Sequence, residues 1–204
     1  MLRWLDILFP PRADEKALRG LAPDDFAALL DPRQVPDTRP PATALLPFSD
    51  TRVRAAIHEA KYHGNERAFD LLADTLAEYL LMIDEADFCT FSIIPIPLSK
   101  KRRRMRGYNQ VEEVARRAAE KAGGMLVETT LLTRVRDTES QTTLSRAARK
   151  ENVRDAFKAV RKADPSYTYI ILDDVLTTGA TLQEAIDALI AAGARHVIPL
   201  ALAH

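Results

Sequence analysis

Two adjacent carboxylates and a run of small and hydroxyl-bearing residues follow a strongly apolar segment near the end of the chain. After Ile170–Leu172 come Asp173 and Asp174, and then the segment Val175–Thr181, which reads Val-Leu-Thr-Thr-Gly-Ala-Thr. If a helix begins after the glycine, the backbone N–H groups and threonine hydroxyls of this segment can surround a phosphate. Carboxylates beside a phosphate site indicate a ligand that also carries hydroxyl groups or a metal ion. A sugar phosphate meets both requirements.

A purely structural interpretation of the same segment is also available. Thr181-Leu182-Gln183-Glu184 matches the capping box with which many helices begin. That interpretation explains Thr181 and Glu184, but it gives no role to the paired acids or to the small residues that follow them. We therefore favour a ligand site.

The order of apolar strand, two acids and Thr-Thr-Gly-Ala-Thr resembles the 5-phosphoribosyl-1-pyrophosphate (PRPP) signature of type I phosphoribosyltransferases. The resemblance implies that Asp173 and Asp174 are catalytic residues that hold the ribose hydroxyls. It implies Mg²⁺ as the cofactor, brought by PRPP to a place near these acids and not held by protein ligands alone. The 5-phosphate would contact the loop residues Thr177, Thr178, Gly179, Ala180 and Thr181.

Further segments narrow the resemblance to the ComF family, the competence-associated branch of these proteins. They are Leu5–Pro11, Ala55–Gly64, Ile94–Leu98 with Arg102–Gln110, and Arg134–Thr138 with residues between Gln141 and Phe157. ComF proteins commonly carry a cysteine-rich zinc ribbon after the first of these segments, but residues 12–45 contain no cysteine. The chain has one cysteine, Cys89, and its four histidines are too scattered to form a metal site with it. We therefore expect no zinc, because a thiolate site needs several cysteines.

The resemblance also implies roles for two loops. The turn after the first core strand would bind pyrophosphate through Leu98, Ser99 and Lys100. Residues 134–155 match a mobile flap that closes over the reacting ribose, with Arg134 and Arg136 as catalytic residues. A long polar hairpin without a direct chemical role is the alternative for this segment.

Positive charge is concentrated in the middle of the chain. Residues 97–161 contain 17 Lys and Arg against 8 Asp and Glu, although the whole chain has 29 of each. Such a block is often only a solvated face, but it can also offset the charge of leaving pyrophosphate or hold single-stranded DNA by phosphate contacts and base stacking. The candidate nucleic-acid or substrate contacts are Arg102, Arg103, Arg104, Arg106, Tyr108, Asn109 and Gln141.

The elements that must position these residues alternate between strand and helix. We expect helices at 52–62, 65–84, 109–122 and 180–192, strands at 91–96, 167–172 and 196–203, an extended stretch at 125–133 and a basic turn at 97–109. Such a pattern predicts an α/β fold, a parallel twisted sheet with helices on both faces and ligands at the carboxyl ends of its strands. The resemblance makes this the type I phosphoribosyltransferase fold.

Eight of the twelve prolines lie within the first 47 residues, which disfavours long helices and strands there. We expect residues 1–47 to form a small N-terminal appendage, with short helices near 2–9 and 23–30 and a linker at 31–44. Residues 48–204 would form the phosphoribosyltransferase-like domain.

Composition restricts the remaining possibilities. The chain has 204 residues, of which 47% are hydrophobic, and no net charge. We find no secretory signal and no apolar run of about 20 residues, so we expect a cytoplasmic protein without a membrane span.

The expected function is that of a PRPP- and Mg²⁺-binding protein which, if catalytic, transfers the phosphoribosyl group to a nitrogen nucleophile and releases pyrophosphate. The alternative is a non-catalytic protein that handles single-stranded DNA in uptake or repair and uses PRPP or a nucleotide as a ligand. Expected partners are PRPP, single-stranded DNA, competence or recombination proteins, and a second copy of the chain in a homodimer.

Overall fold

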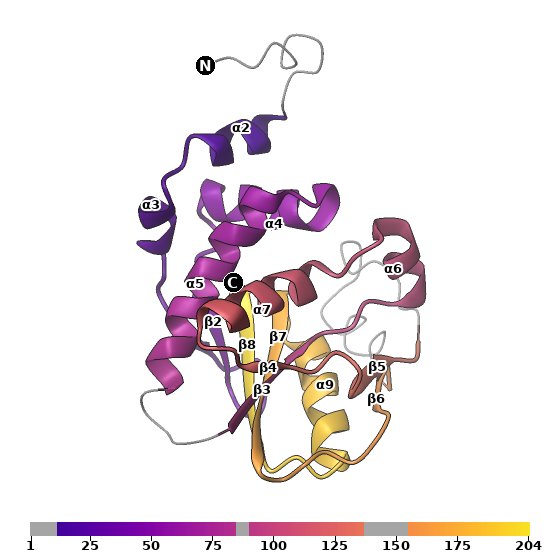
Figure 1. The fold of residues 1–204 in the computed structure, drawn as a ribbon. Helices are drawn as coiled ribbons and strands as arrows, with labels where there is room; N and C mark the ends of the chain where they lie inside the picture. The colour runs from indigo at the N-terminus through magenta and orange to yellow at the C-terminus, as the bar shows by residue number, and fades with distance from the viewer. Residues whose placement is uncertain (1–11, 85–89, 137–154) are drawn as a thin grey trace.

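The computed structural model describes residues 12–84, 90–136 and 155–204. In these ranges, one six-stranded sheet lies between two layers of helices (Figure 1). Its neighbouring strands are parallel, except that the edge strand β1 pairs with β2 in the antiparallel direction. The spatial order is β1 (Arg33–Val35), β2 (Ala42–Leu46), β8 (His196–Ala203), β7 (Tyr167–Val175), β3 (Thr90–Pro95) and β4 (Leu126–Val127). The expected α/β class with a mostly parallel sheet is confirmed.

The sheet buries an apolar layer on each face. Helices α4 (Thr51–His63), α5 (Glu66–Asp84) and α7 (Gln110–Lys121) cover one face, and α9 (Ala180–Ala191) covers the other. Side chains of a strand point alternately to its two faces. In β7, Ile170 and Leu172 therefore pack in the same core as α4, α5 and α7, whereas Tyr169 and Ile171 pack in the core beneath α9.

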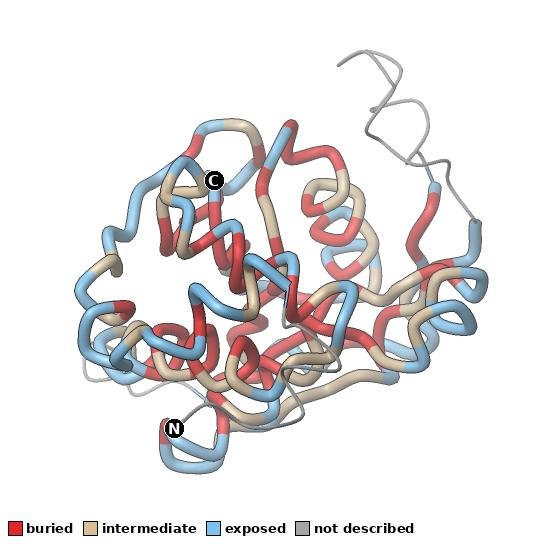
Figure 2. The backbone as a smooth tube through the Cα atoms, turned by 90° about the horizontal axis from the view of Figure 1, so that it is seen from above, coloured by how far each residue is buried: buried red, intermediate tan, exposed pale blue. Residues whose placement is uncertain are grey.

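Shorter elements complete the described fold. They are the helices α2 (Ala13–Arg19), α3 (Pro23–Ala27) and α6 (Lys100–Arg106), and a separate antiparallel pair of strands, β5 (Leu132–Arg134) and β6 (Phe157–Ala159). Buried residues follow the strands of the main sheet and the inner faces of the helices, as the tube in Figure 2 shows. None of the described helices is both long enough and apolar enough to cross a membrane.

Local sequence explains where the helices that flank the site begin and end. Asp50 caps α4 by accepting a hydrogen bond from the Arg52 N–H at 2.8 Å, and α4 ends at Gly64, which adopts the left-handed conformation. Asn109 caps α7 in the same way, with Val111 as the donor at 3.2 Å.

The sequence predictions for the sheet and the main helices agree with the structure to within a few residues, with three differences. The expected linker at 31–44 is wrong, because it contains β1 and the start of β2; all five residues of β2 are buried, and β2 pairs in parallel with β8. The expected basic turn at 97–109 contains α6, which begins where Ser99 accepts a hydrogen bond from the Arg102 N–H and ends at Gly107. The helix expected near 23–30 ends at Ala27, and the helix expected near 2–9 lies outside the described residues.

The sheet thus begins before residue 47. The division of the chain at that residue stays a prediction, but β2 pairs with β8 and belongs to the main sheet.

Candidate functional site

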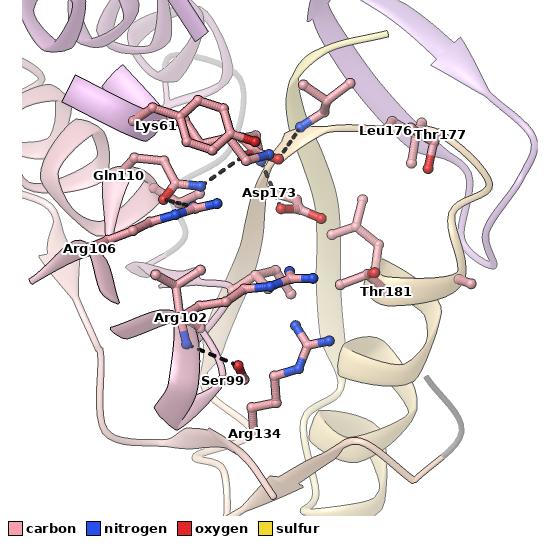
Figure 3. Close-up of a pocket in the computed structure, with 18 of the residues that line it drawn as sticks. Lys61, Ser99, Arg102, Arg106, Gln110, Arg134, Asp173, Leu176, Thr177 and Thr181 are labelled. Carbon is pink, nitrogen blue, oxygen red and sulfur yellow. Dashed lines mark hydrogen bonds and ion pairs between the residues drawn. The ribbon is translucent and has the colours of Figure 1, made fainter. Parts of the chain in front are cut away.

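A cleft of about 720 Å³ opens at the carboxyl ends of β3 and β7 (Figure 3). The two strand ends lie side by side because Pro95 pairs with Leu172 and the Ile96 N–H donates to the Leu172 carbonyl at 2.8 Å. One wall is the loop that joins β7 to α9, and the opposite wall is formed by α6 and the end of β5. The position agrees with the rule that ligands of such sheets bind at the carboxyl ends of the strands.

The two adjacent acids lie at the base of the cleft and face opposite sides of the sheet. Both belong to β7, which is longer than the predicted strand. The alternation that separates Ile171 from Leu172 continues through the acids. Asp174 therefore meets side chains from α4 and α7, whereas Asp173 lies toward the α9 side.

Asp174 is a buried ion-pair partner. Its Oδ2 lies 2.9 Å from Lys61 Nζ and accepts a hydrogen bond from Gln110 Nε2 at 2.7 Å, while Oδ1 accepts from the Val175 N–H at 2.8 Å. Burial acts to raise the pKa of Asp174, but the charge and hydrogen bond of Lys61, together with Gln110, outweigh burial and lower the pKa. Asp174 is therefore held as a carboxylate.

Asp173 has the opposite electrostatic environment. Burial at the base of the cleft, together with the neighbouring charge of Asp174, raises the pKa of Asp173 from 3.8 to about 7. Its Oδ1 accepts a hydrogen bond from the Asp174 N–H at 2.8 Å, and the positive charges of Lys61 and Arg134 act in the opposite direction to burial. The pair thus combines one fixed carboxylate with one acid that is ready to titrate near neutral pH.

The loop after β7 has the shape that the sequence motif requires. All of Thr177–Thr181 line the cleft, and α9 begins at Ala180 with Gly179 as its N-cap. Gly179 has a φ of +68°, and a Cβ at this position would lie 2.8 Å from the carbonyl oxygen of Asp37. Only glycine fits here without a shift of the backbone. Because α9 starts before Thr181, the capping box at Thr181–Glu184 is not the start of the helix.

A segment from the proline-rich N-terminal part supports this loop. Besides the contact between Asp37 and Gly179, the Arg39 N–H donates to Gln183 Oε1 in α9 at 2.7 Å. Thr38 is buried, and its hydroxyl donates to the carbonyl of Pro40 at 2.7 Å. We call residues 37–40 the strap, because they lie against the outer side of the loop.

The wall opposite the loop is rich in cations. Arg102 and Arg134 extend toward the space between Ser99 and the Thr177–Thr181 loop, as Figure 3 shows. Arg134, at the end of β5, is buried, and its guanidinium lies 5.3 Å from the centre of the Phe157 ring. Arg106 also lines the cleft and donates to Gln110 Oε1 at 3.0 Å. The cations can therefore meet a polyanionic ligand, while the acids face its hydroxyl groups.

The structure brings most of the residues predicted from sequence to this cleft. Besides both acids and the five loop residues, the cleft is lined by Leu98, Ser99, Arg102, Arg106, Tyr108 and Arg134. Tyr108 also has an internal role, since its hydroxyl donates to the Ala60 carbonyl at 2.9 Å.

Other predicted residues do not line the cleft. Lys100, Arg104 and Arg136 are exposed beside it, and Arg103 pairs with Glu112 at 3.0 Å. Asn109 is buried and joins two elements, because besides capping α7 it donates to the Ile96 carbonyl at 3.0 Å. Gln141, with most of the expected flap, lies outside the described residues.

Of the cleft residues with charged or amide side chains, three were missed by the reasoning from sequence: Lys61, Lys101 and Gln110. Lys61 and Gln110 both lie in segments that resemble the family, but their side chains gave no separate signal of contact with Asp174. The helical spacing of α6 turns Lys101 toward the cleft and leaves Lys100 outside it. The alternation of β7 turns its even-numbered residues toward α4 and α7. This signal could have pointed to Lys61 and Gln110 as partners of Asp174.

One cluster of metal-binding residue types occurs in the described part of the chain. The ligand atoms of His58, Glu59 and His63 lie within 4.8 Å of one another. The buried Glu59 carboxylate, however, accepts two hydrogen bonds from Arg12, at 2.8 and 2.7 Å, and one from Asn65 at 2.9 Å. Its contacts are those of an ion pair that joins α4 to the segment before α2.

Comparison with known proteins identifies the family. The chain is 30% identical over 162 residues to the DNA utilization protein YhgH of Salmonella typhi, in a match that covers 78% of this chain and 70% of that protein. YhgH of Salmonella typhimurium strain LT2 matches to the same extent. The chain belongs to the ComF family. Competence protein F of Haemophilus influenzae is 37% identical to this ComF-family chain over 95 residues, which are 46% of the chain and 41% of that protein.

Family models and solved structures give two further comparisons. No family model matches the chain. Among solved structures, the allosteric regulatory enzyme of purine biosynthesis is similar with a TM-score of 0.43 at 21% identity. The glutamine PRPP amidotransferase of B. subtilis, complexed with ADP and GMP, is similar with a TM-score of 0.44 at 20% identity. Each match covers 71% of this chain and 30% of the other. This ComF-family chain has the expected α/β fold with a mostly parallel sheet, and its assignment to the type I phosphoribosyltransferase fold stays a prediction.

Proposed function

We propose that this ComF-family chain binds PRPP with Mg²⁺ in the cleft and transfers its phosphoribosyl group to a nitrogen nucleophile. The observation that carries the proposal is the arrangement across the cleft: Asp173 and the Thr177–Thr181 loop face the cations Arg102 and Arg134. A sugar that carries a phosphate at one end and a pyrophosphate at the other matches this distribution of charge.

Each side chain has a role that follows from its position. The N–H groups and hydroxyls of Thr177–Thr181, at the start of α9, would hold the 5-phosphate. Asp173 would accept hydrogen bonds from ribose hydroxyls. Arg102 and Arg134 would stabilise the charge that develops on pyrophosphate as its bond to the ribose C1 breaks and the bond to nitrogen forms. Pyrophosphate leaves with the electron pair of the broken bond, and the nitrogen then gives up its proton to water.

The cleft also fits Mg²⁺ that arrives with PRPP. The donor set near the ribose position consists of carboxylate oxygens, which are ligands that Mg²⁺ accepts alongside substrate phosphates and water. When bound, the ion would supply charge neutralisation to the leaving pyrophosphate.

Calorimetric titration of PRPP with Mg²⁺ into the purified protein tests this proposal. We expect saturable binding that is lost in the double variant Asp173→Asn/Asp174→Asn. A matched control is Asp24→Asn/Asp25→Asn, another adjacent pair of acids, which is exposed in α3 and far from the motif in sequence. If the wild-type protein does not bind PRPP at millimolar concentration, or if the cleft variant binds as well as the control, the proposal is wrong.

A second candidate function is the handling of single-stranded DNA. It is favoured by α6, where Lys100 and Arg104 are exposed outside the cleft and Met105, which lines the cleft, is 77% exposed. The relatives are named for DNA utilization and competence. Exposed cations of this kind can contact the phosphates of a single strand.

A further inference from the structure

The contacts of the two acids point to different roles for them. Asp174 accepts hydrogen bonds from Gln110 and from the Val175 N–H and pairs with Lys61, so three protein donors already occupy its two oxygens. Asp173 accepts a hydrogen bond from the Asp174 N–H and is partly exposed to the cleft. A ligand therefore meets Asp173 before it can meet Asp174.

Lys61 maintains this difference between the contacts of Asp173 and those of Asp174. It comes from α4, more than a hundred positions before the acids in sequence, and its side chain lines the same cleft. A buried carboxylate without a cation is costly, because burial removes its hydration. The 2.9 Å contact between Lys61 Nζ and Asp174 Oδ2 offsets that cost.

Gln110 connects Asp174 to the wall of the cleft that carries the arginines. Its amide nitrogen donates to Asp174, and its amide oxygen accepts from Arg106 at 3.0 Å. The orientation of the Gln110 amide is therefore fixed at both ends, and Asp174 holds groups from α4 and α7 at defined positions. Arg106 in turn lies 5.1 Å from the centre of the Tyr62 ring, next to Lys61 in sequence.

We infer that Lys61 is a positioning residue of the PRPP site: it anchors Asp174 as an internal counter-ion, which leaves Asp173 as the acid that engages the ribose hydroxyls. The inference rests on the proposed function, because it gives the two acids of that site separate roles. It differs from the role implied by family resemblance, in which both acids hold the ribose.

The first experiment measures PRPP binding with Mg²⁺ by calorimetry in Lys61→Met and Lys61→Arg. We expect Lys61→Met to weaken binding at least about tenfold, because Asp174 loses its cation and no longer fixes the base of the cleft. Lys61→Arg keeps a cation there and should retain affinity within about threefold. The matched control is Lys121→Met, which removes a lysine that pairs with Asp74 between α7 and α5, outside the cleft.

The second experiment is a double-mutant cycle on thermal stability without ligand, with Lys61→Met, Asp174→Asn and the double variant. We expect each single variant to lower Tm and the double variant to lower it by less than the sum. Asp173→Asn should leave Tm unchanged or raise it, because it removes a carboxyl group that is buried beside a like charge.

The outcomes separate the two proposals. If wild type binds PRPP but Lys61→Met binds equally well, or Lys61→Arg binds no better than Lys61→Met, the inference is overturned and the proposed function stands. If wild type does not bind PRPP, the proposed function fails together with the ribose role of Asp173. In that case the cycle still decides whether Lys61 anchors Asp174, and additive losses of Tm would overturn that part.

Discussion

Adjacent residues of one strand have opposite acid–base behaviour in this protein. Asp173 and Asp174 share the end of β7, yet the pKa of the first is raised and that of the second is lowered. The cause is the alternation of the strand, which turns Asp174 toward Lys61 and Gln110 and turns Asp173 away from them. The sequence shows both acids, but it does not show which cation each one meets.

The raised pKa of Asp173 predicts a dependence of stability on pH. With a pKa of about 7 in the folded protein against 3.8 as the ordinary value, the folded state keeps a proton that the unfolded chain releases. The contribution of this group to the free energy of unfolding therefore falls as pH rises from about 4 to about 7. Asp173→Asn removes this contribution.

We expect wild type to lose stability relative to Asp173→Asn as the pH is raised from 5 to 8. Urea unfolding at several pH values measures the effect, with Asp24→Asn as the control that keeps the wild-type dependence. Parallel curves for wild type and Asp173→Asn would show that Asp173 titrates as an ordinary carboxyl group.

At the scale of elements, the loop between β7 and α9 depends on a segment that is distant in sequence. Gly179 has a φ of +68°, and a Cβ added there would lie only 2.8 Å from the Asp37 carbonyl oxygen. We expect Gly179→Ala to lower stability by about 1–3 kcal/mol and to weaken PRPP binding, because the strap or the loop must move.

Gly20→Ala is the matched control for that prediction. Gly20 caps α2 with a φ of −91°, and an added Cβ there meets nothing within 4 Å. Thermal unfolding and calorimetric titration of both variants measure the two effects. If Gly179→Ala matches Gly20→Ala in both measurements, the close packing of the strap has no functional consequence.

Elements were predictable from sequence wherever hydrophobic periodicity was strong. The strands at β3, β7 and β8 and the helices α4, α5, α7 and α9 follow such patterns. The pairing of β2 with β8 was not predictable, because prolines around β1 and β2 suggested a linker and nothing local identifies the partner strand. For the same reason Lys61 was missed, since its contact with Asp174 depends on how α4 packs on the sheet.

At the scale of the whole molecule, the chain has no net charge, yet α6 has a basic surface. Because Lys100 and Arg104 lie outside the cleft, Lys100→Ala/Arg104→Ala separates DNA binding from PRPP binding. If α6 binds single-stranded DNA, the double variant should weaken binding. It should also reduce the slope of log affinity against log salt by about 1.4, which is about 0.7 for each lost phosphate contact.

The control removes the same charge elsewhere. Lys162→Ala/Arg195→Ala takes two exposed cations from the other end of the sheet, near the start of β8. Fluorescence anisotropy of a labelled oligonucleotide at several salt concentrations provides the measurement. Equal slopes for the two double variants would exclude α6 as the DNA-binding face.

The ion pair between Lys61 and Asp174 also has a consequence for dissection of the protein. A fragment that starts at β3 would contain the complete Asp173–Thr181 motif and every arginine of the cleft, yet it would lack Lys61, the strap and β2, one of the two strands that pair with β8. The segment that carries the recognisable signature is therefore shorter than the part of the chain that a working site needs. Such a fragment could contain the whole motif while its buried carboxylate had no counter-ion.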